Sequence, residues 1–279
     1  MSEYIIIKNL HADDVNFEQN FSVIGNFPAI TSFLGFVHAI FRKINGLNDI
    51  AVCPVLHNLE MYKGIEKHIP DLDKIKTGSG ASLVPSIKGS VDFSLIIEVN
   101  SSQYTRKESI IDDVQKAIIG LTLSGGVIKF NDHIEESIIY AINSNFEKYV
   151  STIPTGKIVS DATELLFYPN SLEDKMDELI DIVSIKKDED GNILPNKYEG
   201  YLLPIAIGYA SLENITKREG RNGVNDHCYV ESVIGLGEIL HFSKKRIRKV
   251  FTKKVFWYYN YAKPDKNKGS FLCSGYNKY

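Results

Sequence analysis

The stretch NFPAITSFLGFVHAIFRKI, residues Asn26 to Ile44, predicts the first helix of the chain and the order of the elements around it. Its apolar residues recur at intervals of three and four, which places them on one buried helix face: Ile30, Phe33, Leu34, Val37, Ile40, Phe41 and Ile44. Pro28 suits the first turn, and Asn26 and Thr31 can cap free amides there. Gly46 is expected to end the helix. Gly35 costs it about 1 kcal/mol relative to alanine, so either a ligand or a packed element must approach closely there.

Extended segments flank this helix on both sides. Tyr4 to Ile7 and Ile50 to Leu56 are predicted strands, and VDFSLIIEV, Val91 to Val99, is the strongest strand candidate. A second helix is expected over Arg106 to Ile119, followed by the turn LTLSGG and another strand. The polar residues between 60 and 88 form an excursion from the sheet. This order predicts an α+β fold of the ferredoxin-like, split βαβ type.

The remainder of the chain divides into two parts. Residues 1–133 are assigned to the core with its excursion, and residues 134–197 to a helical insertion containing HIEESIIYAINSNFEKYV and SLEDKMDELIDIV. Residues 198–279 return to the core. Two strands are expected there, Gly200 to Leu212 and His227 to Ile239, with a polar loop between them and a helix after them.

Composition restricts the class of protein. The chain has 279 residues, of which 43% are hydrophobic and 24% charged, as in an ordinary soluble protein. It shows no apolar run of membrane-spanning length and no signal peptide, so we expect a cytoplasmic protein without a membrane partner. Its three cysteines, Cys53, Cys228 and Cys273, form no CxxC pair and are predicted to be reduced, structural thiols.

Positive charge is concentrated near the C-terminus. Between Ile239 and Pro264 there are eight Lys or Arg residues and no Asp or Glu. Subtracting these eight charges from the net −3 leaves −11 on the rest of the chain. Such separation suggests two partners, one of them anionic.

A glycine pair precedes this basic segment. Gly235 and Gly237 are expected to form a turn from strand to helix, with Ser243 as the N-cap, whose backbone amides could approach a phosphate. A tight structural turn is the alternative. In the helix that follows, four side chains should form a basic face suited to contact with the phosphates of a nucleic acid: Lys244, Lys245, Arg248 and Lys249. A solvated surface remains the alternative.

Catalytic and metal-binding motifs are absent from the sequence. There is no HExxH, GxSxG, Walker loop or Asp-x-Asp cluster, so no metal and no cofactor is predicted. His38 and Arg42, one helical turn apart, could serve RNA cleavage as acid and charge stabiliser. A histidine exposed beside RNA or packed against the sheet is the favoured alternative.

Four separated stretches resemble one family in their order along the chain: NFPAITSFLGFVHAIFRKI, LSGGVI, GYLLPIAIGYASL and YVESVIGLGEILHFS. The segment WYYNYAKPDK adds an aromatic run followed by a Pro-Asp turn. The family is the type I-F CRISPR subunit called Csy protein two, of the fifth Cas family within the RAMP superfamily. Asn26-Phe27-Pro28 stands where the family usually has Gly-Phe-Pro.

The resemblance implies a ferredoxin-like, RRM-like (RAMP) core that grips the 5′ handle of CRISPR RNA within a surveillance complex. It implies no catalysis, pairing with the large subunit, contact with the backbone subunit, and an indirect role in recognising target double-stranded DNA. A thumb-like excursion meeting the guide would correspond to Glu60 to Lys88, with basic candidates Lys63, Lys67, Lys74 and Lys76. The Asn26 to Thr31 turn, with Phe27 and Pro28, would join the two glycines on one RNA-facing surface, and Phe27 or Tyr104 could stack on a base.

Two rival functions stay open. One is a metal-independent endoribonuclease, which would need His38, or another histidine, beside a tyrosine or lysine. The other is a protein-only adaptor whose basic helix docks on an acidic partner.

Overall fold

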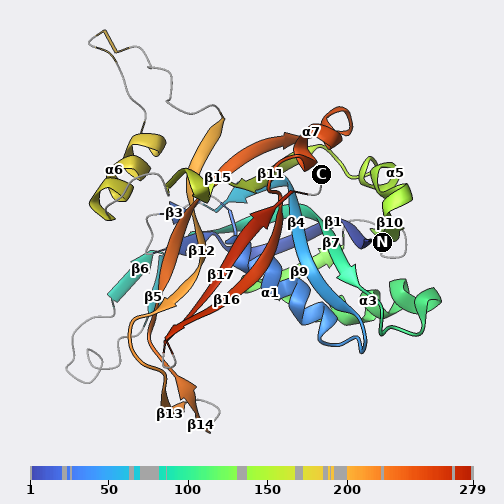
Figure 1. Cartoon of the computed structure of the whole chain (residues 1–279), viewed down its shortest axis with the longest axis horizontal. Helices are drawn as coiled ribbons and strands as arrows, with labels where there is room; N and C mark the ends of the chain where they lie inside the picture. Colours follow the sequence, from blue (N-terminus) through green and yellow to red (C-terminus); the bar gives the residue numbers. More distant parts are fainter. Residues whose placement is uncertain are drawn as a thin grey trace.

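One antiparallel sheet of eleven strands organises the chain (Figure 1). The computed structural model describes residues 2–20, 24–25, 27–62, 66–69, 82–85, 87–130, 137–166, 172–184, 188, 190–191, 200–220, 223–265 and 268–277. The α-helices of this part of the chain are α1 (Ile30–Phe41), α3 (Ile110–Ile118), α5 (Phe146–Val150), α6 (Leu172–Val183) and α7 (Ile247–Phe251). The expected α+β class is therefore confirmed.

The main sheet contains β1 (Glu3–Asn16), β4 (Asn48–Met61), β7 (Lys88–Asn100), β8 (Thr122–Leu123), β9 (Gly126–Phe130), β10 (Ile138–Ile142), β11 (Gly156–Asp161), β12 (Tyr201–Ser211), β15 (Val230–Phe242), β16 (Phe256–Asp265) and β17 (Lys268–Tyr276). Three two-stranded sheets lie outside it, formed by β2 (Glu18–Asn20) with β3 (Ile24–Gly25), β5 (Glu66–Ile69) with β6 (Ser82–Pro85), and β13 (Thr216–Gly220) with β14 (Gly223–His227). The 3-10 turns are η1 (Lys107–Ser109), η2 (Asn143–Asn145), η3 (Thr163–Leu166) and η4 (Lys244–Arg246).

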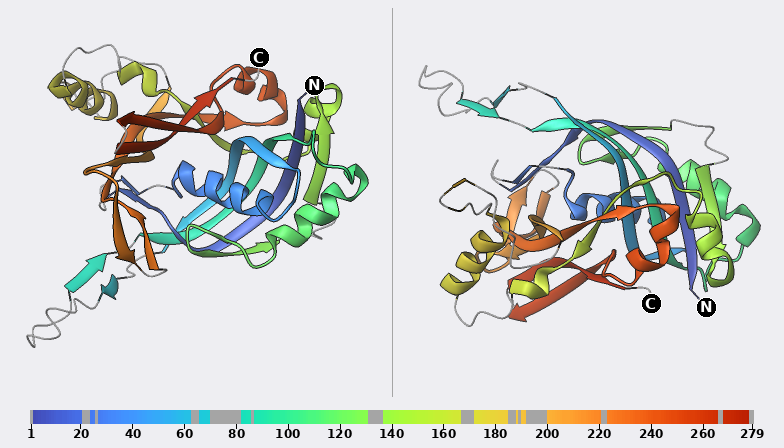
Figure 2. Two further views of the ribbon diagram at one scale, coloured as in Figure 1. Left: turned by 60° about the horizontal axis from the view of Figure 1, so that its bottom comes forward. Right: turned by 90° about the horizontal axis from the view of Figure 1, so that it is seen from above.

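The order predicted for the first half of the chain is confirmed. Strand β1 is followed by α1, β4, the β5–β6 hairpin, β7, α3 and β9. These strands lie side by side as β4-β7-β1-β9, and each neighbouring pair is antiparallel. Among the described residues of the expected excursion, β5 pairs with β6, and this hairpin projects from the main sheet (Figure 2).

Strand β1 is longer than the sequence predicts, because bulges carry it through the polar HADDVN segment. Its register shifts between Ile7 and Leu10 and again between Ala12 and Val15. Asn9 and Asp14 take φ values of +56° and +59° at these points, a conformation that Asn and Asp tolerate better than most residues. The extension is important because one edge of β1 pairs first with β10 and then with β9.

Both faces of the sheet are covered by helices. Alternate residues of β1 enter different cores: Ile5 and Ile7 join the one that contains α1 and α3, while Tyr4 and Ile6 join the one that contains α5 and α7. The two halves of the sheet meet at β4, which pairs with β7 on one side and touches β16 and β11 at single residue pairs on the other. Helix α1 contacts β4, β12 and β16 and so lies between the halves (Figure 2).

Residues 134–197, predicted to be a helical insertion, contain strands as well as helices. Helix α6 confirms the SLEDKMDELIDIV pattern, but Ile138–Ile142 forms strand β10 and Gly156–Asp161 forms strand β11, both in the main sheet. A short continuous apolar run fits a strand as well as a helix, and here the edge of β1 decides between them.

The predicted basic C-terminal helix is present but short. A 3-10 turn, η4, begins after Ser243 as expected, but α7 ends at Phe251. The segment that follows, which includes Tyr258, forms strand β16. The aromatic run FWYYNY favours a strand, and β16 pairs with β17, a strand that the sequence did not predict.

Hydrogen bonds to the Glu3 carboxylate hold the N-terminal strand β1 to its neighbours. Glu3 accepts hydrogen bonds from Tyr140 Oη at 2.6 Å, from Lys107 Nζ at 3.0 Å and from the Ser101 hydroxyl. Burial raises the pKa of Glu3, but these three donors outweigh it and lower the pKa to about 2. The carboxylate is thus stabilised in its charged form only in the folded protein.

Glu3→Gln should therefore lower the free energy of unfolding at pH 7 by about 1 to 3 kcal/mol. Because the folded pKa lies below the ordinary value, this stabilisation is present above about pH 4.5 and is lost as the pH falls toward 2. Urea denaturation across this range measures the effect, with the exposed Glu108→Gln as the control. If the difference in free energy of unfolding between the wild type and Glu3→Gln stayed constant between pH 5 and pH 2, the lowered pKa of Glu3 would be contradicted.

Candidate nucleic-acid interface

Five exposed cationic side chains gather on η4 and α7, and we call them the basic surface: Lys244, Lys245, Arg246, Arg248 and Lys249. The inner face of α7 packs against the protein, since Ile247, Val250 and Phe251 are buried in the core that contains α5. The apolar spacing therefore turns the intervening lysines and arginines to solvent. The exposed basic face predicted from the sequence is present, although on two short turns of helix.

Acidic partners reach part of this segment from elsewhere in the fold, which a local reading of the sequence could not show. Arg248 Nε lies 3.1 Å from Glu147 on α5, Lys253 Nζ lies 3.2 Å from Glu238, and Lys254 pairs with Glu164. Among the described residues no acidic side chain pairs with Lys244, Lys245, Arg246 or Lys249. These four charges remain available to an anion.

The predicted glycine turn does not exist. Gly235 and Gly237 lie in the middle of β15, where they pair with β12 and, for Gly237, also with β11. A Cβ on Gly235 would come within 2.6 Å of Thr163 Oγ1 and 2.9 Å of the Ile207 side chain. On Gly237 it would come within 2.9 Å of Val159. The glycines therefore make room for side chains of neighbouring elements, and their amides belong to the sheet rather than to a phosphate-binding loop.

Gly235→Ala should destabilise the fold by about 1 to 3 kcal/mol, because the new methyl group displaces Thr163, whose hydroxyl accepts a hydrogen bond from the Leu236 amide. Gly35→Ala is the matched control. An added Cβ there meets only Tyr259 Oη at 3.8 Å, so alanine should stabilise the exposed helix position by up to about 1 kcal/mol. Chemical denaturation measures both. If Gly235→Ala instead left stability intact and removed RNA affinity, the phosphate-loop interpretation would return.

The turn before α1 differs in detail from its prediction. The N-cap is Ala29, no side chain caps the helix, and Pro28 precedes the N-cap instead of occupying the first turn. Asn26 lies outside the described residues. Gly46 has φ +84° and follows the helix end by several residues, where its missing side chain clears the backbone of Gln103.

Neither aromatic residue suggested for base stacking presents an open ring. Phe27 is 3% and Tyr104 4% exposed, both within the core around α1. Tyr104 donates a hydrogen bond to Asp113 at 2.8 Å. Stacking on RNA would require either ring to leave this core. The stacking prediction is corrected accordingly.

Of the four lysines predicted on the thumb-like excursion, one lies in the part of the chain that the structure describes. Lys67 belongs to β5, opposite Val84 of β6. Lys63, Lys74 and Lys76 lie outside the described residues. Their expected contacts with a guide RNA stay predictions.

A groove of 430 Å³ opens where β4, β11, β12 and β15 meet the turn before α1. Its apolar lining consists of Phe27, Leu56, Leu59, Leu203 and Ile239, and its polar lining of Lys157, Tyr201 and His241. The register of the sheet brings them together, since Lys157 pairs with His241 and Tyr201 with Ile239. None of the described lining residues is acidic.

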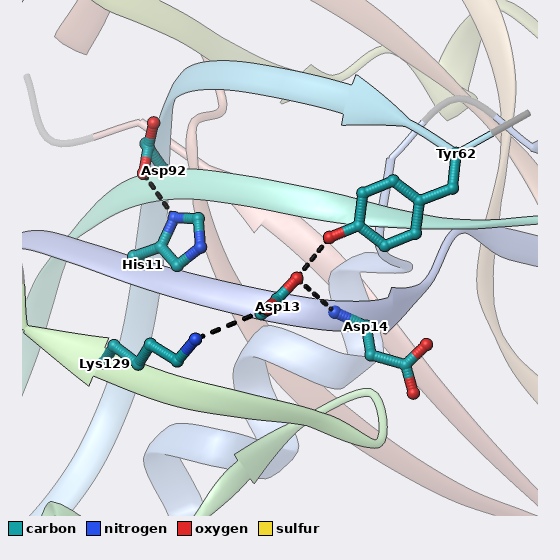
Figure 3. A network of polar contacts seen from close by, with 6 residues as sticks. All are labelled: His11, Asp13, Asp14, Tyr62, Asp92 and Lys129. Atoms are coloured by element: carbon teal, nitrogen blue, oxygen red, sulfur yellow. Dashed lines mark hydrogen bonds and ion pairs between the residues drawn. The ribbon is translucent and has the colours of Figure 1, made fainter.

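A separate polar network lies farther along β1 (Figure 3). Asp13 accepts a hydrogen bond from the Tyr62 hydroxyl and pairs with Lys129 at 3.4 Å, while His11 Nδ1 lies 2.7 Å from Asp92 Oδ1. The hydrogen bond to Asp13 raises the pKa of Tyr62, and that same bond, with Lys129, lowers the pKa of Asp13. Tyr62 is thereby held as a neutral donor, so the network joins strand ends to the base of the excursion.

The residues considered for catalysis are not assembled into an open site. His38 is exposed and lies 3.3 Å from Asp49. His57 Nε2 lies 2.7 Å from Ser94 Oγ, but Ser94 is completely buried and its oxygen also accepts a hydrogen bond from the Asn9 amide. Burial lowers the pKa of His57, which favours the neutral ring. This Ser-His pair therefore fastens β4 and β7 at the bulge of β1.

Within the part of the chain that the structure describes, no three His, Cys, Asp or Glu side chains lie close enough to hold a metal ion, and no helix has the length and hydropathy needed to cross a membrane. All three cysteines are free, and Cys53 and Cys273 are buried. Cys53 and Cys273 are therefore core side chains, and the reduced state of the thiols stays a prediction.

The groove is the part of the site that sequence reasoning missed. Lys157, Tyr201 and His241 belong to three segments that are far apart in the sequence, and Lys157 falls in the stretch predicted to be a helical insertion. The usable signal was the short β-branched pair Ile158-Val159, bounded by Gly156 and Asp161, which fits a strand as well as a helix. In the structure this strand pairs with the segment Gly237–Phe242 of β15.

The fold and its surface define a mixed α+β protein built on a large antiparallel sheet, with a projecting hairpin and an exposed cationic face. A family model described as CRISPR-associated protein (Cas_Csy2) matches residues 5–273 of this chain. The chain therefore belongs to the Csy2 family of type I-F CRISPR systems, which confirms the resemblance seen in its motifs.

Proposed function

We propose that this chain is a non-catalytic, cytoplasmic subunit of a type I-F CRISPR surveillance complex that binds the 5′ handle of CRISPR RNA. It pairs with the large subunit, contacts the backbone subunit and supports recognition of target double-stranded DNA. The observation that carries the proposal is the basic surface, with four cations lacking acidic partners in the described part of the chain, on a member of a CRISPR-associated family.

The strand order supports a ferredoxin-like core, which this RNA-binding function requires. The arrangement β4-β7-β1-β9, with α1 and α3 as connections packed in one core, follows the order of a split βαβ fold. We interpret it as the RAMP core, and the β5–β6 hairpin as its thumb. Lys63, Lys67, Lys74 and Lys76 would then contact the guide RNA and the backbone subunit.

RNA is held mainly by charge in this proposal. Lys244, Lys245, Arg246 and Lys249 approach the phosphates of a single strand and release its counterions, an interaction that depends on salt and not on sequence. Arg248 contributes less, because Glu147 already neutralises it. Phe27, Pro28 and Thr31 contribute through the position of the turn before α1, next to the groove.

The two rival functions, endoribonuclease and protein-only adaptor, predict different results when the chain meets RNA. Incubating the full chain with repeat RNA from its own CRISPR array, without divalent metal, should give a salt-sensitive complex and intact RNA. Cleavage at a defined position would support the endoribonuclease. Absence of RNA binding, with partner binding that survives nuclease treatment, would support the adaptor.

A further inference from the structure

We propose that Asp13 and Asp14 of β1 are positioning residues, which set the direction in which the β5–β6 hairpin leaves the main sheet. The excursion that carries the hairpin begins after Tyr62, which follows β4, and ends at Lys88, which opens β7. Each of these two leg residues bonds to one of the two aspartates. The part of the inference that concerns assembly rests on the proposed function, because it takes the hairpin as the thumb that contacts the backbone subunit.

The two legs need support from a third element. Met61 pairs with Gly89, and the Tyr62 amide donates a hydrogen bond to the Lys88 carbonyl at 2.8 Å, so the legs stay paired up to the edge of the sheet. In the part of the excursion that the structure describes, β5 then pairs with β6 alone. A two-stranded hairpin is marginally stable by itself and twists more than a wide sheet does. A fixed direction therefore depends on contacts at its root.

Strand β1 provides these contacts through its second bulge. In a regular strand, neighbouring side chains point to opposite faces, so two adjacent aspartates would not serve the same feature. Here the register of β1 against β7 shifts across Asp13 and Asp14, and Asp14 takes a φ of +59°. The Asp13 carboxylate accepts a hydrogen bond from the Tyr62 hydroxyl (Figure 3), and the Asp14 carboxylate pairs with the Lys88 ammonium. One bulge thus holds both legs.

The surroundings of the bulge strengthen both contacts. The Lys88 side chain is only 11% exposed, so its ammonium has lost much of its water and depends on the Asp14 carboxylate. Asp13 is itself held in place, because it accepts the Asp14 amide at 3.0 Å and pairs with Lys129 of β9 at 3.4 Å. The legs are therefore fastened to two neighbouring strands of the main sheet, β1 directly and β9 through Asp13.

The test removes both leg contacts and leaves the bulge unchanged. Tyr62→Phe removes the hydroxyl and keeps the ring, and Lys88→Met removes the ammonium and keeps most of the stem. The matched control is Tyr140→Phe with Lys107→Met, because these two side chains make the same kinds of bond to Glu3, another carboxylate of β1. The control double variant loses comparable bonds at the end of β1 that does not contact the hairpin.

Pulsed electron paramagnetic resonance measures the direction of the hairpin in the full-length chain. Spin labels are attached at Ser82→Cys on β6 and at Ile119→Cys, an exposed position after α3. The background carries Cys228→Ser, since the other two cysteines are buried. We expect a narrow distance distribution in this background and in the control double variant, and a broader or shifted one in the Tyr62, Lys88 double variant.

The same variants are loaded with repeat RNA and titrated with the backbone subunit. If about a third to a tenth of the Tyr62, Lys88 double variant holds the competent direction, its apparent affinity should fall about 3- to 10-fold. The control double variant should bind the backbone subunit as the wild type does.

An unchanged distance distribution in the Tyr62, Lys88 double variant would overturn the inference and leave the proposed function in place. Equal broadening in the control double variant would also overturn it, because general destabilisation would then explain the result. A broadened distribution with unchanged affinity for the backbone subunit would overturn the link to assembly and the assignment of the hairpin as the thumb. A wild type that binds neither RNA nor the backbone subunit would defeat the proposed function, while the distance distributions would still decide whether the aspartates set the direction.

Discussion

Alanine at Lys244, Lys245, Arg248 and Lys249 lowers the affinity for single-stranded repeat RNA about 100- to 1,000-fold near 0.1 M salt, if these side chains contact phosphates as we propose. Each phosphate contact contributes about 0.7 to the slope of log affinity against log salt for a single strand. Removal of four contacts should therefore reduce the magnitude of that slope by up to about 3. Arg248 should contribute least to the loss of affinity, since its guanidinium already pairs with the Glu147 carboxylate.

The control for this experiment lies in the same segment. Lys253 pairs with Glu238 and Lys254 with Glu164, so alanine at these two positions removes charge that is already neutralised. The Lys253, Lys254 double variant should bind RNA more tightly than the Lys244, Lys245 double variant. Equal losses in the two double variants would mean that net charge, and not the basic surface, governs binding. An unchanged slope of log affinity against log salt in the quadruple variant would mean that the basic surface does not contact RNA phosphates.

Trp257→Ala is expected to cost about 3 to 5 kcal/mol of the free energy of unfolding. Trp257 is completely buried in β16, opposite Val52 of β4, and its indole nitrogen donates a hydrogen bond to the Val159 carbonyl of β11 at 2.9 Å. It thus joins three strands at the place where the two halves of the sheet meet. Its removal leaves both a cavity and an unpaired carbonyl.

Guanidinium denaturation followed by circular dichroism measures this loss. Trp257→Phe separates its parts, because phenylalanine refills much of the cavity but cannot donate to Val159, and should cost less than alanine. The chain contains a single tryptophan, so its fluorescence in the wild type reports on this joint alone. A loss below 1 kcal/mol for Trp257→Ala would indicate that the halves are held together elsewhere.

The first half of the fold could be predicted because its elements have strong, local patterns. The apolar spacing of α1 and the unbroken apolar run of β7 each identify one kind of element. The long extension of β1 could not be predicted, since HADDVN is polar and enters the strand only through bulges at Asn9 and Asp14. These bulges depend on partners far away in the sequence, such as Ser94, which binds the Asn9 amide.

The candidate site was only partly predictable, for a related reason. The basic surface depends on a local charge pattern, so Lys244 to Lys249 could be identified from the sequence alone. Gly235 and Gly237 were misread because a glycine that opens a turn and a glycine that accommodates a neighbouring side chain look the same in one dimension. Only the positions of Thr163 and Ile207 distinguish them. The ion pairs of Arg248 and Lys254 likewise join segments about 100 and 90 residues apart.

RNA recovered with the protein tests the central claim most directly. The full chain is purified from cells that express its CRISPR repeat RNA, half of the sample is treated with nuclease, and the protected RNA is sequenced. The account predicts short fragments that share one 5′ repeat-derived end, and their loss from the Lys244, Lys245, Arg248, Lys249 quadruple variant. Protected RNA of no common sequence, or no protected RNA even when the large subunit is present, would contradict it.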